Sequence, residues 1–272
     1  MKFLFLGSGG ATTIPKPGCG CRVCGEARQK GLPYSRLGPC LFLPEHNLLL
    51  DTPEGLYIAL ERHSIRKIGG LIYSHFHRDH LNGIGAIEEL LVDHLRLEHR
   101  RIPLYATPSL LKTLRENLTL LSFYLDGLGI LRWARMTDLE PTVVDGLAIT
   151  PVPLSQPGFY GYILADEARR ALVVPDHFNL FDPGCVKPGL DLAILEMGYI
   201  PPLRDGFVPP PGHRVFRRLM SLERCISIAR DTLRAERVIF THIEEIFGRS
   251  FDELADLGSE LGVEFAHDGM EI

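Results

Sequence analysis

Short apolar runs alternate with amphipathic stretches in the first half of the chain. The runs at 2–6, 47–51 and 68–73 are bounded by glycine or by acidic and polar residues, and they predict buried strands. Helical patterns follow at 55–63 and 84–97. The polar cluster between the third run and the second helical stretch therefore lies at a strand-to-helix junction, where side chains of mixed α/β folds are accessible to ligands.

The second half repeats the order of strands followed by a helix. We predict a helix at 221–235 and strands at 147–154, 160–165, 170–175, 191–196 and 237–241. Segment 200–214 holds five prolines and two glycines, so it predicts a long surface loop of the kind that often forms a lid. We expect one α/β domain over 1–272, and the absence of internal repeats excludes solenoids and propellers.

Composition changes this picture little but excludes several classes of function. Of the 272 residues, 45% are hydrophobic and 23% are charged, which suits a single large core. A net charge of -5 lacks the basic excess of proteins that bind phosphate backbones, so a nucleic-acid partner is not expected. The first apolar run is too short for a secretion signal, and no stretch approaches the roughly 20 apolar residues of a membrane span. We therefore expect a cytoplasmic protein without a membrane partner.

A dense group of metal-binding residues follows the strand at 68–73. His75, His77, Asp79 and His80 supply three imidazoles and one carboxylate within six residues, the usual ligands of zinc, manganese or iron. If the loop turns at Arg78, the first pair can face one metal and the second pair another, as in two-metal hydrolases that activate water. This spacing predicts an active-site metal centre with Asp79 among its catalytic residues.

Ionisable residues also follow three other predicted strands. Asp176 comes after Leu-Val-Val-Pro, His242 comes after Val-Ile-Phe-Thr, and Asp51 ends the run at 47–51. Each alone is weak evidence, because turns also favour aspartate. Together with the first cluster, Asp176 and His242 complete a binuclear ligand set, and Asp51 is interpreted as a partner that orients a histidine ligand.

Three of the six cysteines form a second candidate metal site. Cys19, Cys21 and Cys24 lie within six residues of a glycine-rich segment. In a chain without a secretion signal, such crowding favours metal binding over disulfides, although three free thiols in a turn remain the alternative. Cys40, Cys185 and Cys225 stand alone in apolar surroundings and are expected to be buried.

These motifs resemble a known family. The sequence H-F-H-R-D-H at 75–80, Asp176, the T-H-I at 241–243 and Asp51 are similar to the metallo-β-lactamase superfamily. Within it, C-G-C-R-V-C at 19–24, L-G-S-G-G at 6–10 and the ending D-G-M-E-I resemble the phosphoribosyl cyclic phosphate phosphodiesterases of phosphonate degradation. The similarity is weakest at 84–145 and 197–220.

The resemblance implies a four-layer αββα sandwich, a homodimer and a phosphodiester-cleaving metal pair of zinc, manganese or iron. It assigns His75 and His77 to one metal and Asp79 and His80 to the other. It also implies that Asp176 bridges the two metals and that His242 completes the second. A separate structural zinc, one per chain, falls to the three cysteines.

Three positions depart from the family pattern. Gln156 stands where a histidine ligand is expected, so the first metal site is altered, and His177 is the nearest substitute. The family's histidine before Ser-Leu-Glu is replaced by leucine and methionine, and His213 is the upstream candidate for a general acid. The fourth ligand of the cysteine zinc falls at Glu245, with His267 as a competitor.

We therefore expect a metal-dependent hydrolase that acts on a phosphodiester or a similar small anionic ester. The alternative is a non-hydrolytic or redox member of the fold that binds a small molecule, like superfamily proteins of cofactor biosynthesis. The altered ligand at Gln156 favours that alternative. A ribonuclease like the transfer-RNA 3′-processing members has the H-x-H-x-D-H motif in its favour and the acidic charge against it.

Overall fold

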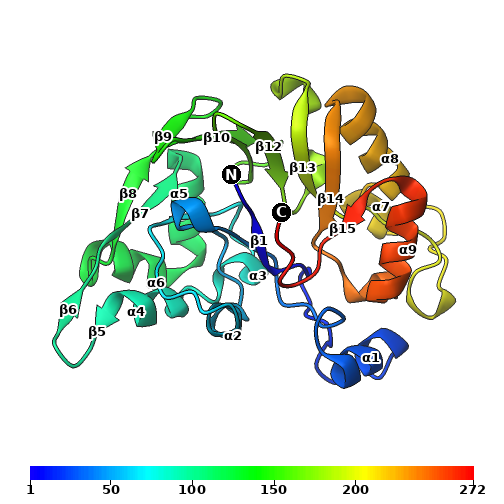
Figure 1. The fold of residues 1–272 in the computed structure, drawn as a ribbon, viewed down its shortest axis with the longest axis horizontal. Helices are drawn as coiled ribbons and strands as arrows, with labels where there is room; N and C mark the ends of the chain where they lie inside the picture. The colour runs from blue at the N-terminus through cyan, green and yellow to red at the C-terminus, as the bar shows by residue number, and fades with distance from the viewer.

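The computed structural model describes all 272 residues, and two β-sheets packed face to face form its centre (Figure 1). The first sheet has the order β1-β2-β3-β4-β7-β8. Its pairs β1–β2 and β2–β3 are antiparallel, and the pairs from β3 to β8 are parallel. Its strands are β1 (Leu4–Gly7), β2 (Cys40–Leu43), β3 (Leu48–Leu50), β4 (Gly70–Ile72), β7 (Ile102–Ala106) and β8 (Leu131–Arg135).

The second sheet has the order β15-β14-β13-β12-β11-β10-β9. Its strands are antiparallel from β9 to β12 and parallel from β12 to β15. The parallel half brings the ends of β12 and β14 to the same edge of the sheet. The strands are β9 (Thr142–Val144), β10 (Leu147–Pro153), β11 (Tyr160–Ala165), β12 (Arg170–Val174), β13 (Leu190–Glu196), β14 (Ala235–Thr241) and β15 (Glu264–Phe265).

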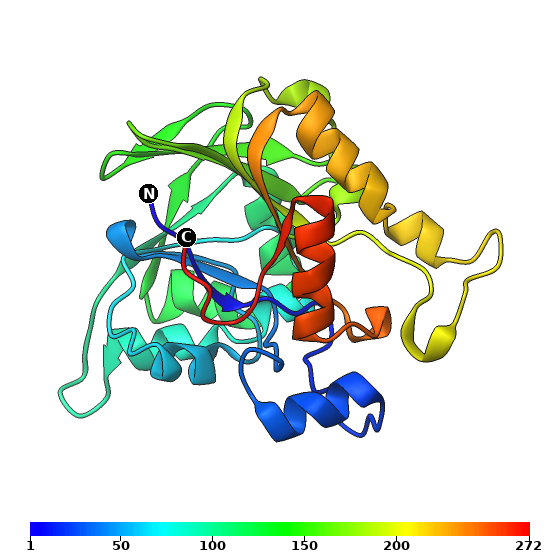
Figure 2. The ribbon, with the colours of Figure 1, turned by 45° about the vertical axis from the view of Figure 1, so that its right-hand side comes forward.

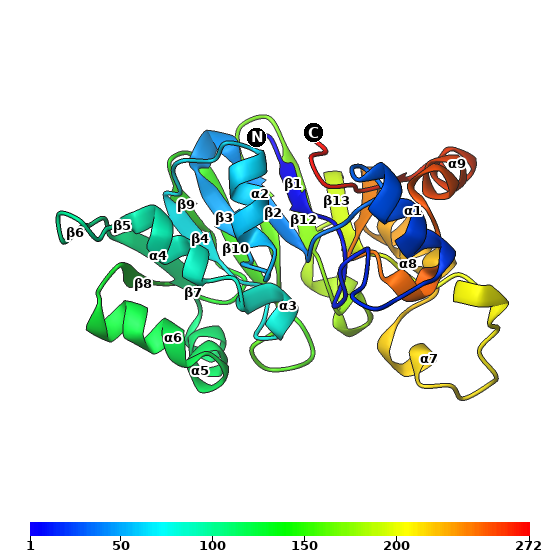
Figure 3. The ribbon, with the colours of Figure 1, turned by 90° about the horizontal axis from the view of Figure 1, so that it is seen from below.

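Helices cover the outer face of each sheet (Figures 1 and 3). The first sheet carries α2 (Leu56–Arg62), α4 (Gly85–Leu91), α5 (Pro108–Asn117) and α6 (Thr119–Ser122), and α3 (Arg78–Leu81) follows β4. The second carries α8 (Leu222–Ser227) and α9 (Phe251–Leu261), while α7 (Val215–Arg218) lies in the long connection before α8. Helix α1 (Arg22–Lys30) lies at the start of α9, as Figure 2 shows from another side. The architecture is therefore the predicted αββα sandwich.

Alternation along the second sheet explains the two main clusters of buried residues. Tyr162 and Leu164 of β11 face the first sheet and join a core of 48 buried residues. Ile163 lies between them in sequence and points the other way, into a core of 27 residues shared with α8 and α9. Successive side chains of a strand point to opposite faces, so a strand that is apolar at every position serves both cores.

The structure corrects the prediction of a helix at 84–97. Helix α4 ends at Leu91, and a protruding hairpin of β5 (Val92–Asp93) and β6 (Glu98–His99) follows it. Ala86, Ile87 and Leu91 are buried, whereas Leu95 and Leu97 are 88% and 86% exposed. The apolar periodicity continues beyond Leu91, but no surface of the protein packs against it, so the helix is not stabilised.

The long loop, the last predicted helix and the isolated cysteines can also be compared with their predictions. Segment 200–214 is largely irregular, as expected, and no helix of the chain is long and apolar enough to cross a membrane. The helix predicted at 221–235 is confirmed over Leu222–Thr232, where α8 continues directly into a π-helical turn at Ile228–Thr232. Cys40 and Cys225 are buried, but Cys185 is exposed on the turn after β12, which contradicts its predicted burial.

Candidate metal centre

The loop after β4 and the short helix α3 carry the first four candidate ligands. His75 and His77 lie in the loop, and Asp79 and His80 lie in the first turn of α3. The residue before the helix, His77, is extended, and the helical turn then rotates the chain by about 100° per residue. Because the backbone changes from extended to helical at Arg78, the side chains before and after it point in different directions. The sequence predicted this for a turn at Arg78.

Two strand ends of the second sheet supply the remaining ligands. Asp176 and His177 follow β12, and His242 follows β14. His177 and His242 have φ of 55° and 58°, a left-handed backbone that residues with a side chain rarely adopt. Such strain persists where the surrounding structure holds it, and it clusters at functional sites. Here it turns both imidazoles back toward α3.

Asp176 lies at the middle of the cluster. Its Oδ2 atom is 3.2 Å from His75 Nε2, 3.3 Å from His177 Nε2, 3.5 Å from His80 Nε2 and 3.6 Å from His242 Nε2. Two overlapping groups share it, each with ligand atoms within 4.8 Å of one another. The groups are His75, His77, Asp176 and His177, and Asp79, His80, Asp176 and His242.

Buried polar atoms without partners show that these residues fit metal ions. His75 Nε2, Asp79 Oδ2, His80 Nε2 and His242 Nε2 are buried and have no hydrogen-bond partner. A buried polar atom left unsatisfied costs about 1–3 kcal/mol, so four that converge on one place require an explanation. Imidazole nitrogens and carboxylate oxygens of this kind are the ligand atoms of zinc, manganese and iron.

Burial and charge set the pKa values within the cluster. Burial lowers the pKa of His75 well below its usual value and keeps its ring neutral. Burial alone would raise the pKa of Asp176, but His242 and His75 outweigh it and hold that pKa well below its ordinary range. The central carboxylate is therefore ionised, which is the form that binds a cation.

Asp51 orients the ligands from behind. Its Oδ2 accepts a hydrogen bond from His80 Nδ1 at 2.8 Å and from Ser74 Oγ at 2.7 Å, and Ser74 Oγ lies 3.0 Å from His75 Nδ1. A carboxylate on Nδ1 places the proton there and leaves Nε2 free to bind a metal. The predicted role of Asp51 as an orienting partner agrees with this geometry.

Two residues of the site were missed in the sequence. Phe159 stacks on His75 with ring centroids 4.7 Å apart and closes the apolar side of the centre. Glu196, at the end of β13, is buried and accepts the N–H of Phe178 at 2.8 Å. Burial and the neighbouring Asp176 raise its pKa well above the ordinary value. The signal for Glu196 was an apolar run ending in an acid, the same signal that indicated Asp51.

Two other predicted residues make no hydrogen bond to the cluster. The exposed side chain of Gln156 makes no hydrogen bond to the histidines, and His177 occupies the place beside His75 and His77. His213 lies on the long loop, where its Nδ1 accepts the N–H of Val215 at 3.3 Å and its ring packs against Phe207. The structure gives His213 no contact with the candidate ligands.

The cysteine cluster is assembled separately, between the start of α1 and the turn after β14. Cys19, Cys21, Cys24 and Glu245 have ligand atoms within 4.8 Å of one another. The Cys19 thiol donates to Glu245 Oε1 at 3.2 Å, while Glu245 Oε2 is buried without a partner. These four residues fit one tetrahedral metal ion.

Two further side chains lie near the cysteine cluster. Arg204 of the long loop also pairs with Oε1 of Glu245, so this carboxylate connects the loop to the cluster. His267, the competitor for the fourth position, instead places its Nδ1 3.1 Å from the carbonyl of Asp268 and packs against Phe251. Glu245 is therefore the residue that the fold brings to the thiols.

The chain is similar to known proteins over most of its length. Residues 46–243 match the family model described as the beta-lactamase superfamily domain. No curated protein sequence matches the chain. Among solved structures, a diphosphatase from the PhnP family is 25% identical with a TM-score of 0.73, and the alignment covers 100% of this chain and 96% of that one.

Two more distant structures share the fold. The zinc-bound PqqB protein from Methylobacterium extorquens is 18% identical with a TM-score of 0.75 over 100% of this chain and 99% of its own. The short form of human tRNase Z is 17% identical with a TM-score of 0.63 over 100% and 98%. The predicted superfamily, the likeness to the PhnP group and the fold are thus confirmed.

Proposed function

Because the chain belongs to the metallo-β-lactamase superfamily, we propose that it is a metal-dependent hydrolase that cleaves a phosphodiester or a similar small anionic ester. The observation that carries this proposal is the convergence of His75, His80, His242 and Asp79 on the carboxylate of Asp176, with buried ligand atoms that have no other partner. The likeness to a diphosphatase supports chemistry at phosphorus.

Each of the two overlapping groups would bind one metal ion. His75, His77 and His177 would hold one divalent cation and Asp79, His80 and His242 the other, with Asp176 between them. Bound there, such cations supply Lewis acidity toward an anionic ester and lower the pKa of water. His177 takes the place that Gln156 leaves open, so the altered sequence still gives each group an imidazole-rich set.

Residues around the centre orient the histidine ligands and exclude water from one side of it. Asp51 and Ser74 fix the rings of His80 and His75, so their Nε2 atoms need little reorganisation on binding. Phe159 covers the face of His75 and keeps bulk water from that side. Glu196 is a buried carboxyl next to Asp176 whose raised pKa favours the protonated form, so it holds a proton within the centre.

The proposal is tested by metal content and by turnover together. Protein purified without added metal is analysed for zinc, manganese and iron, and then assayed with bis-p-nitrophenyl phosphate before and after chelation. We expect two or more metals per chain, with hydrolysis that the chelator abolishes and added metal restores. Asp176→Asn should lose the active-site metals and the hydrolysis but keep the zinc of the cysteine cluster, whereas Asp182→Asn, the same change on an exposed turn, should keep all of them. Metal-loaded protein without turnover on this or other small esters would favour the non-hydrolytic alternative.

A further inference from the structure

The cysteine cluster has a carboxylate as its fourth candidate ligand, and this adds a negative charge. Structural zinc sites with three cysteines commonly take a neutral histidine as the fourth ligand, whereas here the fold brings Glu245 to the three thiols. Thiols that bind a metal lose their protons, so a divalent ion in this set has two excess negative charges rather than one. The Glu245 side chain is completely buried, where an uncompensated charge is costly. The additional charge therefore requires a partner.

Arg204 provides that partner. Its guanidinium pairs with Oε1 of Glu245, and its Nη1 atom lies 3.8 Å from Cys19 Sγ. Glu245 Oε2 is buried without a partner, so one oxygen is free for a metal while the other stays on the arginine. A ligand whose second polar atom is already held needs little reorientation when the metal binds. The arginine thus both orients this carboxylate and offsets its charge.

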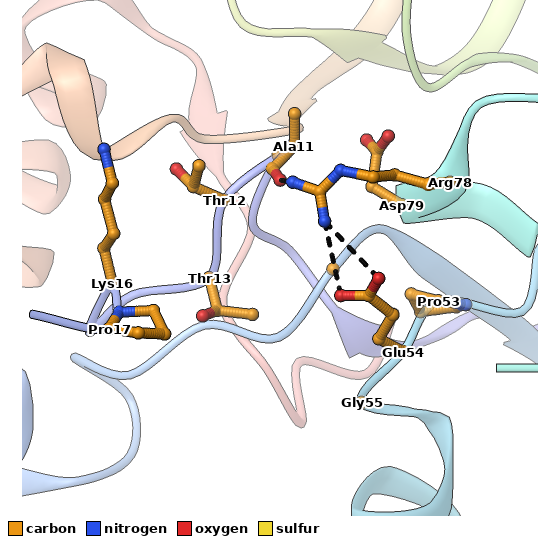
Figure 4. Close-up of a pocket in the computed structure, with 12 residues that line it drawn as sticks. Ala11, Thr12, Thr13, Lys16, Pro17, Pro53, Glu54, Gly55, Arg78 and Asp79 are labelled. Atoms are coloured by element: carbon orange, nitrogen blue, oxygen red, sulfur yellow. Dashed lines mark hydrogen bonds and ion pairs between the residues drawn. The ribbon is translucent and has the colours of Figure 1, made fainter. Parts of the chain in front are cut away.

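Other polar groups around the cluster do not offset this charge. The N–H of Lys16 donates to Cys24 Sγ at 3.3 Å, but a backbone N–H has no full charge. Figure 4 shows the Lys16 side chain lining the neighbouring cavity. Arg28 donates to the carbonyls of Lys16 and Cys19, not to a thiol. Arg204 is therefore the arginine that contacts the candidate ligands of the cluster.

Arg204 also attaches the long loop at 200–214 to the cluster. No other side chain of this loop forms an ion pair with a different element of the fold. The backbone of the loop lies directly against the turn after Glu245, because a Cβ added to Gly248 would lie 2.7 Å from Arg204 Cα. Beyond this contact the loop is more exposed, as at Val208, which is 65% exposed. The charge of Glu245 is thus the main polar attachment of the loop.

From these contacts we propose that Arg204 is a positioning residue for the metal of the cysteine cluster, and that a metal bound there fastens the loop at 200–214. Coupling of this kind is reciprocal: if the arginine strengthens metal binding, the metal strengthens the contact of the arginine by the same factor. Partners that hold a metal ligand typically change metal affinity by about 10–100-fold. The proposal does not rest on the function of the histidine centre.

The affinity of the cysteine site can be measured separately from that of the histidine centre. Cobalt(II) bound by thiolates absorbs strongly through charge transfer, so cobalt is titrated into the reduced, metal-free protein and then displaced by chelator-buffered zinc. We expect Arg204→Met to weaken zinc binding at this site by about 10–100-fold. Arg214→Met, the same change at an exposed arginine of the loop, should leave it unchanged.

A second background tests whether Arg204 acts through the charge of Glu245. Glu245→Gln removes the charge and keeps the shape of the side chain. In this background Arg204→Met should change zinc affinity by about twofold or less, because the partner of the guanidinium is gone. Unchanged affinity in the single variant Arg204→Met would overturn the proposal. An equal loss in both backgrounds would also overturn it.

Hydrogen exchange tests the loop directly. The N–H groups of Leu203, Gly206 and Phe207 donate within the turn around Arg204 at 2.8, 3.1 and 3.2 Å, so their exchange reports whether the turn is formed. Zinc should slow it about tenfold or more in the wild-type protein. Zinc should have no effect in Arg204→Met, which keeps the histidine centre. Exchange that is independent of zinc in the wild-type protein would overturn the coupling. Neither measurement uses turnover, so both remain decisive if the chain hydrolyses no ester.

Discussion

His80 Nδ1 lies 2.8 Å from Asp51 Oδ2, and both side chains are completely buried. The imidazole therefore presents its other nitrogen to Asp176, and its affinity for a metal ion would depend on Asp51, which lies outside both candidate ligand groups. Partners of this kind typically change metal affinity by about 10–100-fold when they are lost.

We expect Asp51→Asn to weaken metal binding by about that factor without unfolding the protein. Asparagine is nearly isosteric and tolerates the left-handed backbone of Asp51, which has φ of 66°. Competition with a chromogenic chelator measures the affinity. Asp182→Asn serves as the control, and an unchanged affinity in Asp51→Asn would remove the orienting role.

His177→Ala should lower the metal content by about one ion per chain, because it removes an imidazole from the group of His75 and His77. Gln156→Ala should leave occupancy unchanged, since that side chain is exposed. Elemental analysis of the two variants, purified in parallel, decides between them. The reverse result would show that Gln156, which stands where a histidine ligand is expected, binds the metal in place of His177.

Metal loading should release protons. Burial opposes a charge on His242, but Asp176, Asp79 and Glu244 outweigh it and raise the pKa of the imidazole to about 10. Asp51 and other carboxylates likewise raise the pKa of His80 against the effect of burial. Both rings are thus protonated at neutral pH in the metal-free protein and must lose their protons to bind a metal.

In protein that retains the cysteine-cluster zinc, we therefore expect about two protons per chain to be released when the active-site groups are loaded, and an affinity for metal that rises with pH through the neutral range. Calorimetric titrations in buffers with different ionisation enthalpies count the protons, with titration of a simple chelator as the control. An observed enthalpy that is independent of the buffer would contradict the raised pKa values.

Cys21→Ser should release about one zinc per chain and lower the melting temperature, because a structural metal contributes directly to folding stability. Cys185→Ser, the same change at an exposed thiol, should do neither. Unchanged zinc content would refute the Cys19, Cys21, Cys24 and Glu245 site.

The sequence predicted most of the metal centre because its ligands stand at strand ends. His75, His77, Asp79 and His80 are also close together in the chain, so their grouping needed no knowledge of the fold. Asp176 and His242 could be added because the ends of parallel strands meet at one edge of a sheet. The pairing of Glu245 with the cysteines depended on the family resemblance, and the structure places these four residues together.

The parts that could not be predicted depend on contacts between distant segments. Phe159 reaches His75 only because β11 passes next to the loop after β4, where the N–H of Tyr160 donates to the carbonyl of Ser74. The hairpin after α4 was mistaken for helix because apolar periodicity does not reveal whether a packing surface exists.

The left-handed backbone at Asp51, His177 and His242 has a consequence for the history of such proteins. Conformations of this kind cost on the order of 1–3 kcal/mol each, and glycine adopts them without that cost. A lineage released from selection for metal binding would be free to lose these side chains. The side chains that serve metal binding at these three positions thus lower the stability of the fold. We expect related proteins that have lost metal binding and carry glycine there to have a higher melting temperature than the metal-free form of this chain.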